Sequence, residues 1–206
     1  SKIALFTDVE KDAVISAYDV KTTIYEIPLM YHKQKLDHIV VDHLDIEDGE
    51  SDLSAWHNVV KTYNDAEETV KIALVGKYVD LHDTYKSIHE ALIHGGLSKQ
   101  RRTEIVYLDS EHLEKSGDFS AHFEGIQGIL VPGGFGQRGI EGMISTARYA
   151  RTRKVPFFGI CLGLQIMVIE YARSVLGYED ANSTEFAHDG PYPVISLLEE
   201  QIDISA

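Results

Sequence analysis

The chain has 206 residues, of which 44% are hydrophobic, and it carries a formal net charge of −14. This length allows one or two domains with a sizeable core, and the negative charge argues against nucleic acid as a partner. A single cysteine excludes an internal disulfide and favours a reducing compartment, so we expect a cytoplasmic protein. We also expect no signal peptide and no membrane association, because no apolar run approaches the length of a membrane span.

Residues 1–43 are too few for a typical independent domain, and we interpret them as the short α/β tail of another domain. A strand is predicted from Ile3 to Phe6. Pro28 suits the first turn of a following helix. The apolar face of this helix would be formed by Leu29, Met30 and Leu36. Because both ends of the chain fall without a clear element boundary, we expect the sequence to be part of a longer protein.

Residues 44–69 change in character and are predicted to form an interdomain linker. They open on the acidic, turn-rich stretch DIEDGESD. Apolar residues then recur at helical spacing. These residues are Leu53, Trp56, Val59 and Val60. We therefore expect a short helix inside the linker, docked through Trp56.

From residue 70 onwards, predicted strands alternate with predicted helices. The strands are expected at 71–76, 104–109, 128–132 and 155–160, and the helices at 84–96, 142–151 and 162–177. Because the strands are apolar on both faces, they predict an α/β fold in which helices cover both faces of a parallel sheet. Ligand sites of such folds lie at the carboxyl ends of the strands. The stretch PGGFG and Cys161 both fall there.

Cys161 is the only cysteine, and it lies at the centre of the pattern G-I-C-L-G (159–163). This is the nucleophile-elbow pattern with cysteine in place of serine. Gly159 and Gly163 would let the strand and the helix approach closely, and the start of the helix would favour the thiolate. The N–H of Leu162 would then be an oxyanion donor. The alternative is an inert cysteine buried in the core.

The stretch VPGGFGQRG (131–139) is the second motif. Glycine-rich turns often hold phosphate groups, which is the competing interpretation. The pattern is neither a Walker A loop nor a complete dinucleotide fingerprint. Next to a nucleophile, the same exposed N–H groups could instead stabilise a tetrahedral oxyanion.

Together the two motifs resemble the class I, or triad, glutamine amidotransferase domain. Longer stretches narrow the resemblance to the CTP synthase family. They are GKYVDLHDTYKSIHEAL (76–92), PGGFGQRGIEGMISTARYAR (132–151), GICLGLQ (159–165) and ANSTEF (181–186). KIALFTDV and AVISAYDV, near the start, resemble the end of the amidoligase domain of that family. The resemblance implies a flavodoxin-like amidotransferase domain over 70–206, after an amidoligase tail over 1–43.

The resemblance also implies a reaction and its ligands. The family uses ATP to phosphorylate UTP and then displaces the phosphate with ammonia, which glutamine hydrolysis supplies. Mg²⁺ accompanies the nucleotides, which would be bound mainly by an N-terminal part that precedes this sequence. GTP activates glutamine hydrolysis. The expected ligands are thus L-glutamine, UTP, ATP and GTP, and the expected assembly is a homotetramer.

Carried over residue by residue, the resemblance makes Cys161 the nucleophile. The oxyanion hole would be formed by Gly133, Gly134 and Leu162. Glutamine would be bound by Gly134, Phe135, Leu162, Gly163, Leu164, Gln165 and Glu185, with Glu185 pairing with the substrate ammonium group. The nucleotide-binding residues would be Lys2, Phe6, Asp19 and Val20, and GTP activation would involve Lys77 and Lys86. No metal ligand is expected in this chain.

One expected part is missing, because a nucleophile of this type needs a base. The family supplies a histidine and a glutamate, two residues apart, downstream of the cysteine. Here only His188 follows Cys161, in a loop flanked by glycine and proline, and we interpret it as a surface residue. The domain is therefore expected to be truncated before its catalytic pair. A non-catalytic binding or assembly module and another class I amidotransferase remain the alternatives, although residues 1–43 weigh against the latter.

Overall fold

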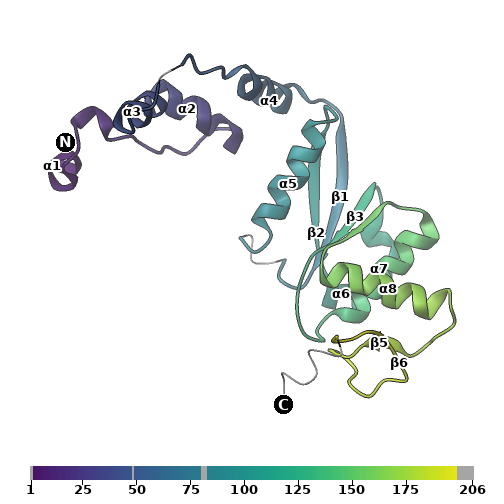
Figure 1. Cartoon of the computed structure of the whole chain (residues 1–206). Coiled ribbons are helices and arrows are strands. Elements are labelled where there is room, and N and C mark those ends of the chain that lie inside the picture. Colours follow the sequence, from purple (N-terminus) through teal and green to yellow (C-terminus); the bar gives the residue numbers. More distant parts are fainter. Residues whose placement is uncertain (1, 48, 80–82, 199–206) are drawn as a thin grey trace. The chain divides into compact units, whose positions relative to one another are not determined.

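The computed structural model describes residues 2–47, 49–79 and 83–198. The chain divides into two compact units, Ser1–Glu68 with Leu97–Arg102, and Thr69–Gly96 with Thr103–Ala206 (Figure 1). Among the described residues, no helix is both long and apolar enough to cross a membrane.

The first unit is built from helices. They are α1 (Lys2–Thr7), α2 (Ile27–Lys33), α3 (Leu36–His43) and α4 (Ser54–Asp65), with short 3₁₀ turns at Lys11–Ala13 and Ile24–Glu26. Pro28 lies in the first turn of α2, as predicted. The single helix expected after it is instead two helices, because Lys35 has a φ of +60° and reverses the chain. Leu36 therefore belongs to α3 and not to the face that carries Leu29 and Met30.

The strand predicted at Ile3–Phe6 is wrong, because these residues form α1. A strand needs a neighbouring strand to pair its backbone groups, whereas a helix pairs its own. Among the described residues this segment has no strand beside it. The tail is thus helical and not α/β. Leu5 and Phe6 are 81% and 84% exposed, so α1 buries little apolar surface.

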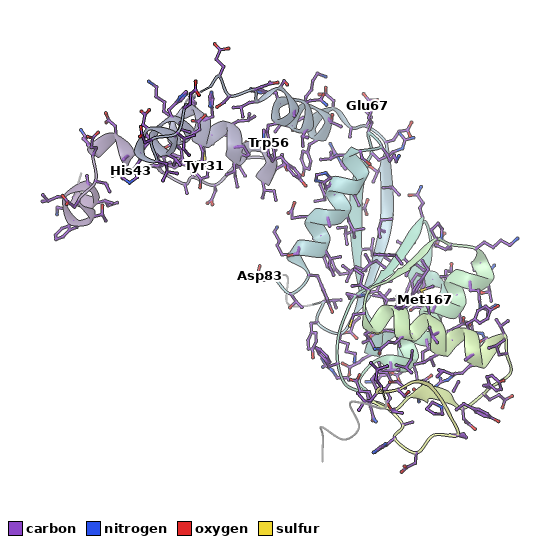
Figure 2. The ribbon with its side chains drawn as sticks, viewed as in Figure 1. Tyr31, His43, Trp56, Glu67, Asp83 and Met167 are labelled. Atoms are coloured by element: carbon purple, nitrogen blue, oxygen red, sulfur yellow. The ribbon has the colours of Figure 1, made fainter. Side chains whose placement is uncertain are left out.

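The helix expected within residues 44–69 is present as α4. Trp56 projects from it (Figure 2) and packs on the ring of Tyr25, with the ring centroids 6.4 Å apart. The aromatic contact joins α4 to the 3₁₀ turn before α2, within the first unit.

The second unit contains the expected alternation of strands and helices. Its elements are β1 (Thr69–Gly76), α5 (Lys86–Leu97), β2 (Arg102–Asp109), α6 (Ser110–Lys115), β3 (Gly128–Val131), α7 (Ile140–Arg153), β4 (Phe157–Gly159), α8 (Leu162–Ser174), β5 (Ala181–Ser183) and β6 (Tyr192–Ile195). The main sheet has the order β2-β1-β3-β4. β3 pairs in parallel with both β1 and β4, so the predicted parallel sheet is confirmed. Strands β5 and β6 form a separate parallel pair.

Helices cover both faces of the main sheet, as predicted. Alternate residues of β1 point to opposite faces. Ala73 and Val75 join the core formed with α7 and α8, whereas Leu74 packs with Ile88 and Leu92 of α5. Figure 1 shows α7 and α8 side by side. The strands are apolar on both faces because both faces are covered.

An ion pair joins α7 to α8. Glu170 is buried, and its carboxylate accepts hydrogen bonds from Nε and Nη2 of Arg151 at 2.8–3.2 Å. We expect Arg151→Met to lower the free energy of unfolding by about 2 kcal/mol, because it leaves a buried carboxylate unpaired. Urea unfolding would measure this effect. The double variant Arg151→Met, Glu170→Leu should recover most of the lost free energy of unfolding. A double variant as unstable as Arg151→Met alone would contradict the prediction.

The register of the sheet brings two loops together. Val131, the last residue of β3, pairs with Gly159, the last residue of β4. Because the strands are parallel, the segments that follow them leave the same edge of the sheet. The loop 132–139 and Cys161 are therefore neighbours.

Candidate active site

Cys161 lies on a tight turn between β4 and α8. Its φ is +52° and its ψ is −107°, a strained backbone conformation for a residue with a side chain. The cysteine is exposed and not buried in the core. The predicted elbow geometry is thus confirmed, and the alternative of an inert core cysteine is wrong. The role of Cys161 as a nucleophile stays a prediction.

The glycines on either side make this turn possible. A Cβ atom on Gly159 would overlap the backbone of Gly163 and come within 2.6 Å of the nitrogen of Leu164. A Cβ atom on Gly163 would overlap the carbonyl oxygen of Val131 and lie 2.9 Å from its carbon. Any side chain at either position would therefore push α8 away from the strands.

The glycine-rich loop lies directly against the elbow. A Cβ atom on Gly133 would be 3.5 Å from the Cβ of Cys161, and one on Gly134 would be 3.3 Å from Cδ2 of Leu162. The backbone N–H groups of Gly133, Gly134 and Leu162 donate to no acceptor among the described residues. Three unpaired donors thus lie in the turn of Cys161 and in the loop packed against it, and N–H groups of this kind are the groups that stabilise an oxyanion.

The buried side chain of Lys77 is hydrogen-bonded to this loop. It follows the carboxyl end of β1, and it is only 4% exposed. Its Nζ donates to the carbonyl oxygen of Phe135 at 2.8 Å and to that of Gly136. Burial lowers the pKa of Lys77. The resemblance assigned Lys77 to GTP activation alone, and the structure shows it buried and bonded to the glycine-rich loop.

The carboxylate of Glu185 is hydrogen-bonded to the same loop. Its Oε1 accepts a hydrogen bond from the N–H of Gly136 at 2.8 Å, and Nε2 of Gln137 donates to the carbonyl of Phe186 at 2.5 Å. The segment after β5 is in turn tied to α8, because Nε of Arg173 donates to the carbonyl of Ala181 at 2.7 Å. Glu185 is therefore brought to the loop by the fold.

Arg138 is a site residue that sequence reasoning missed. Its guanidinium lies 5.2 Å from the ring centroid of Tyr78, and it pairs with Glu111 at 3.0 Å. Its Nη2 also lies 3.4 Å from the carbonyl oxygen of Lys77. The only signal was its place in PGGFGQRG, which indicated a loop residue and no partner.

The remaining predicted residues lie in different settings. Leu164 is exposed in the first turn of α8, and the N–H of Gln165 donates to the carbonyl of Cys161 at 3.2 Å. Phe135 is 82% exposed on the loop. Lys86 is exposed at the start of α5, where its Nζ pairs with Glu90 at 3.2 Å.

The nucleotide residues predicted from the resemblance all lie in the first unit. Lys2 and Phe6 are exposed on α1, Asp19 is exposed in the stretch after the first 3₁₀ turn, and Val20 is half-buried. Nothing in this unit tests their roles, so these assignments stay predictions.

Among the residues that the structure describes, no base is hydrogen-bonded to the thiol. Within the described residues, the side chain of Cys161 has no hydrogen-bond partner. His188 is exposed in the segment between β5 and β6, in line with its interpretation as a surface residue. The site thus offers a thiol, three unpaired donors and a carboxylate.

The fold is that of a class I glutamine amidotransferase domain. Residues 80–198 match the family model of class I glutamine amidotransferases, and the chain belongs to this family. Residues 1–46 match the model described as the N-terminus of CTP synthase.

Curated relatives are CTP synthases. The chain is 54% identical to that of Syntrophus aciditrophicus (strain SB) over 201 residues, which are 98% of this chain and 37% of the relative. It is also 54% identical to that of Geobacter sulfurreducens over 205 residues, 99% of this chain and 38% of the relative. The chain thus spans well under half the length of these relatives.

A solved structure is similar as well. The glutaminase domain of Trypanosoma brucei CTPS, with bound acivicin, matches with a TM-score of 0.58 and 40% sequence identity. The match covers 63% of this chain and 50% of that one. The parallel sheet with its covering helices is therefore shared with a known glutaminase domain.

Proposed function

We propose that this chain is the amidotransferase part, with an adjoining synthetase segment, of an enzyme that aminates UTP to CTP at the expense of ATP. The observation that carries the proposal is the exposed thiol of Cys161, on a strained turn beside three unpaired N–H groups. The CTP synthase relatives and the match of residues 1–46 support it.

In the proposed reaction, Sγ of Cys161 attacks the side-chain amide carbon of glutamine. The new C–S bond moves the carbonyl electrons onto oxygen, and the N–H groups of Gly133, Gly134 and Leu162 stabilise that charge. When the C=O bond re-forms, the C–N bond breaks and the nitrogen leaves as ammonia with one added proton. Water then hydrolyses the thioester to glutamate and restores the thiol.

The start of α8 assists the first step, because the positive end of this 13-residue helix favours the thiolate at Cys161. The proton of the thiol needs an acceptor, and the described residues hold none beside the sulfur. We assign that role to a histidine oriented by a glutamate, encoded after this sequence in the intact enzyme.

Glutamine would be held by its charged end at Glu185. One carboxylate oxygen of Glu185 already accepts from Gly136, so its position is fixed, and Oε2 would receive the substrate ammonium group. The exposed ring of Phe135 would cover the substrate, with Leu164 and Gln165 alongside.

The nucleotide partners belong to the same proposal. Lys2 and Phe6 are one helical turn apart on α1, so an ammonium group and an exposed ring lie on the same face and fit part of a UTP or CTP site. Asp19 and Val20 would contact ATP, and Mg²⁺ would be bound with it by the rest of the enzyme. Activation by GTP through Lys77 and Lys86, a homotetramer and a cytoplasmic location complete the proposal.

The test is Cys161→Ala in the full-length enzyme. Glutamine-dependent formation of CTP should vanish, and formation from added ammonia should survive, because only the first needs the thiol. Product chromatography measures both. Loss of the two activities together would contradict the proposed division of labour.

A non-catalytic binding module is the second candidate, and the unpartnered thiol of Cys161 favours it. Labelling with a glutamine-analogue electrophile, for which we choose acivicin, distinguishes the two candidates. Stoichiometric labelling of Cys161 in the full-length protein supports the enzyme, whereas a folded protein that is not labelled supports the binding module.

A further inference from the structure

Three potential metal ligands meet at the turn between α2 and α3. His32 lies in the last turn of α2, and Asp37 and His38 lie in the first turn of α3. The reversal of the chain at Lys35 brings Asp37 and His38 back towards His32. Nδ1 of His32 and Oδ2 of Asp37 are 2.6 Å apart. One donor atom from each of the three residues lies within 4.8 Å of the other two.

The surroundings of the cluster suit a bound ion. All three side chains are half-buried, which limits competition from water without closing the site. Oδ1 of Asp37 is buried and has no hydrogen-bond partner within the described part of the chain. Ser51 donates to Oδ2 of Asp37 at 2.9 Å and so fixes the carboxylate from outside the cluster.

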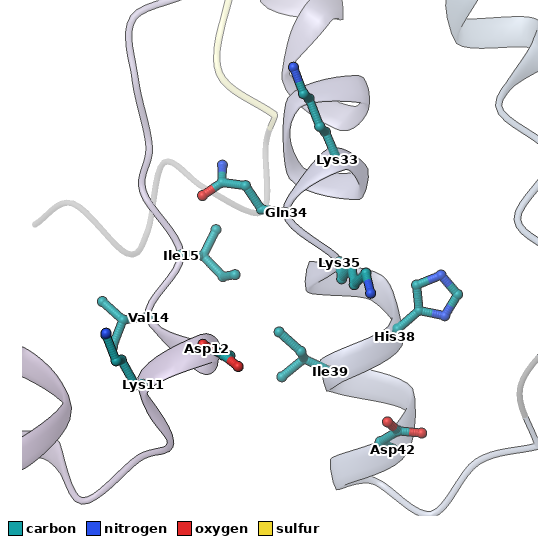
Figure 3. Close-up of a pocket in the computed structure, with 10 residues that line it drawn as sticks. All are labelled: Lys11, Asp12, Val14, Ile15, Lys33, Gln34, Lys35, His38, Ile39 and Asp42. Atoms are coloured by element: carbon teal, nitrogen blue, oxygen red, sulfur yellow. The ribbon is translucent and has the colours of Figure 1, made fainter. Parts of the chain in front are cut away.

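His38 is the residue that makes the cluster more than a hydrogen-bonded pair. His32 and Asp37 alone would be satisfied by sharing a proton. The ring of His38 lies 5.9 Å from that of His32, centroid to centroid, and adds a second imidazole. Figure 3 shows its ring projecting from α3 on the side away from Ile39, and both residues line the same surface pocket.

We propose that His32, Asp37 and His38 bind a divalent transition-metal ion, for which Zn²⁺ is the best match. Two imidazoles and one carboxylate are ligands that Zn²⁺ takes at about 2.0–2.2 Å, with a fourth position left for water. Ligands at these distances lie about 3.3 Å apart around a tetrahedral ion, so Nδ1 of His32 and Oδ2 of Asp37 must separate slightly and His38 must approach them. Half-buried side chains can make both movements by rotation. Lys33 and Lys35 are exposed, so solvent screens their repulsion.

Such an ion would join the end of α2 to the start of α3. The turn between them contains Lys35 in the left-handed region, where a residue with a side chain is uncommon. A metal bound across it would hold the two helices together, independently of the chemistry at Cys161.

The test is calorimetric titration of the 206-residue chain with Zn²⁺. Every protein carries Cys161→Ala, because the exposed thiol would itself bind the ion. His38→Ala removes one ligand, and His43→Ala is the matched control, since His43 is an exposed histidine at the end of the same helix. We expect one Zn²⁺ to bind the parent and the control with equal affinity, and His38→Ala to bind it at least about tenfold more weakly.

Asp37→Asn provides a second variant of unchanged size, and it should weaken binding as His38→Ala does. Circular dichroism verifies that each variant is folded. The visible spectrum of bound Co²⁺ reports the geometry, and it should be four-coordinate in the parent and the control only. Equal affinity of the His38→Ala and His43→Ala proteins, or no Zn²⁺ bound by the parent, would overturn the proposal.

Discussion

Replacing Gly163 with alanine is expected to lower the free energy of unfolding by about 3 kcal/mol. The added methyl group would overlap the carbonyl oxygen of Val131 and lie 2.9 Å from its carbon. Val131 is fully buried in the central strand β3, so the backbone there cannot yield without disturbing the core. Overpacking costs about 1–3 kcal/mol, and a clash with rigid backbone belongs at the upper end. Urea unfolding of the 206-residue chain measures the change.

Gly95→Ala is the matched control, because a methyl group there meets nothing within 4 Å. Gly95 lies in α5, where alanine is the better helix former, so the control should be neutral or gain up to about 1 kcal/mol. Acivicin should label Gly163→Ala far more slowly than the parent enzyme, since displacing α8 moves Leu162 away from the thiol. A stable Gly163→Ala protein that is labelled at the parent rate would show that the close approach at the elbow is not needed.

Gly159 and Gly163 explain why much of the site was predictable from the sequence. The elbow depends on residues two positions from Cys161, and the sheet depends on runs of apolar residues, so both signals are local. Parallel pairing then placed the loop after β3 beside the turn after β4, because such loops share one edge of a sheet.

The contacts that Lys77 and Glu185 make with the glycine-rich loop were not predicted, because their partners are distant in the sequence. Lys77 contacts carbonyl groups 58 and 59 residues away, and Glu185 contacts an amide 49 residues away. No periodicity carries that information. The short pair of strands β5 and β6 was also missed, because three and four residues are too few to show a pattern.

The wrong strand prediction at residues 3–6 arose because a local signal was present but ambiguous. The run Ile3–Phe6 is apolar and is suited to a buried strand, but a short apolar run does not distinguish strand from helix. The choice depends on whether a neighbouring strand is available to pair with it. The left-handed turn at Lys35 was missed for a related reason, since lysine gives no local signal for a positive φ.

Lys77→Met is expected to slow acivicin labelling of Cys161 by about tenfold to a hundredfold in the full-length enzyme. Lys77 donates to the carbonyl oxygens of Phe135 and Gly136, and these contacts orient the two peptide groups after Phe135, in the same loop as Gly133 and Gly134. A small displacement of reacting groups or oxyanion donors costs this much or more. The ammonium is buried, so its removal also relieves a desolvation cost, and the free energy of unfolding should fall by only about 1–2 kcal/mol.

Lys86→Met provides the control, because Lys86 is exposed and its one ion pair within the described residues is with Glu90 on its own helix. If both lysines serve GTP activation alone, the two variants should lose the response to GTP and keep the parent labelling rate without GTP. If Lys77 also positions the loop, only Lys77→Met should be labelled slowly without GTP. Parent-like labelling of Lys77→Met would therefore refute the positioning role, since the loop would hold its shape without the buried ammonium.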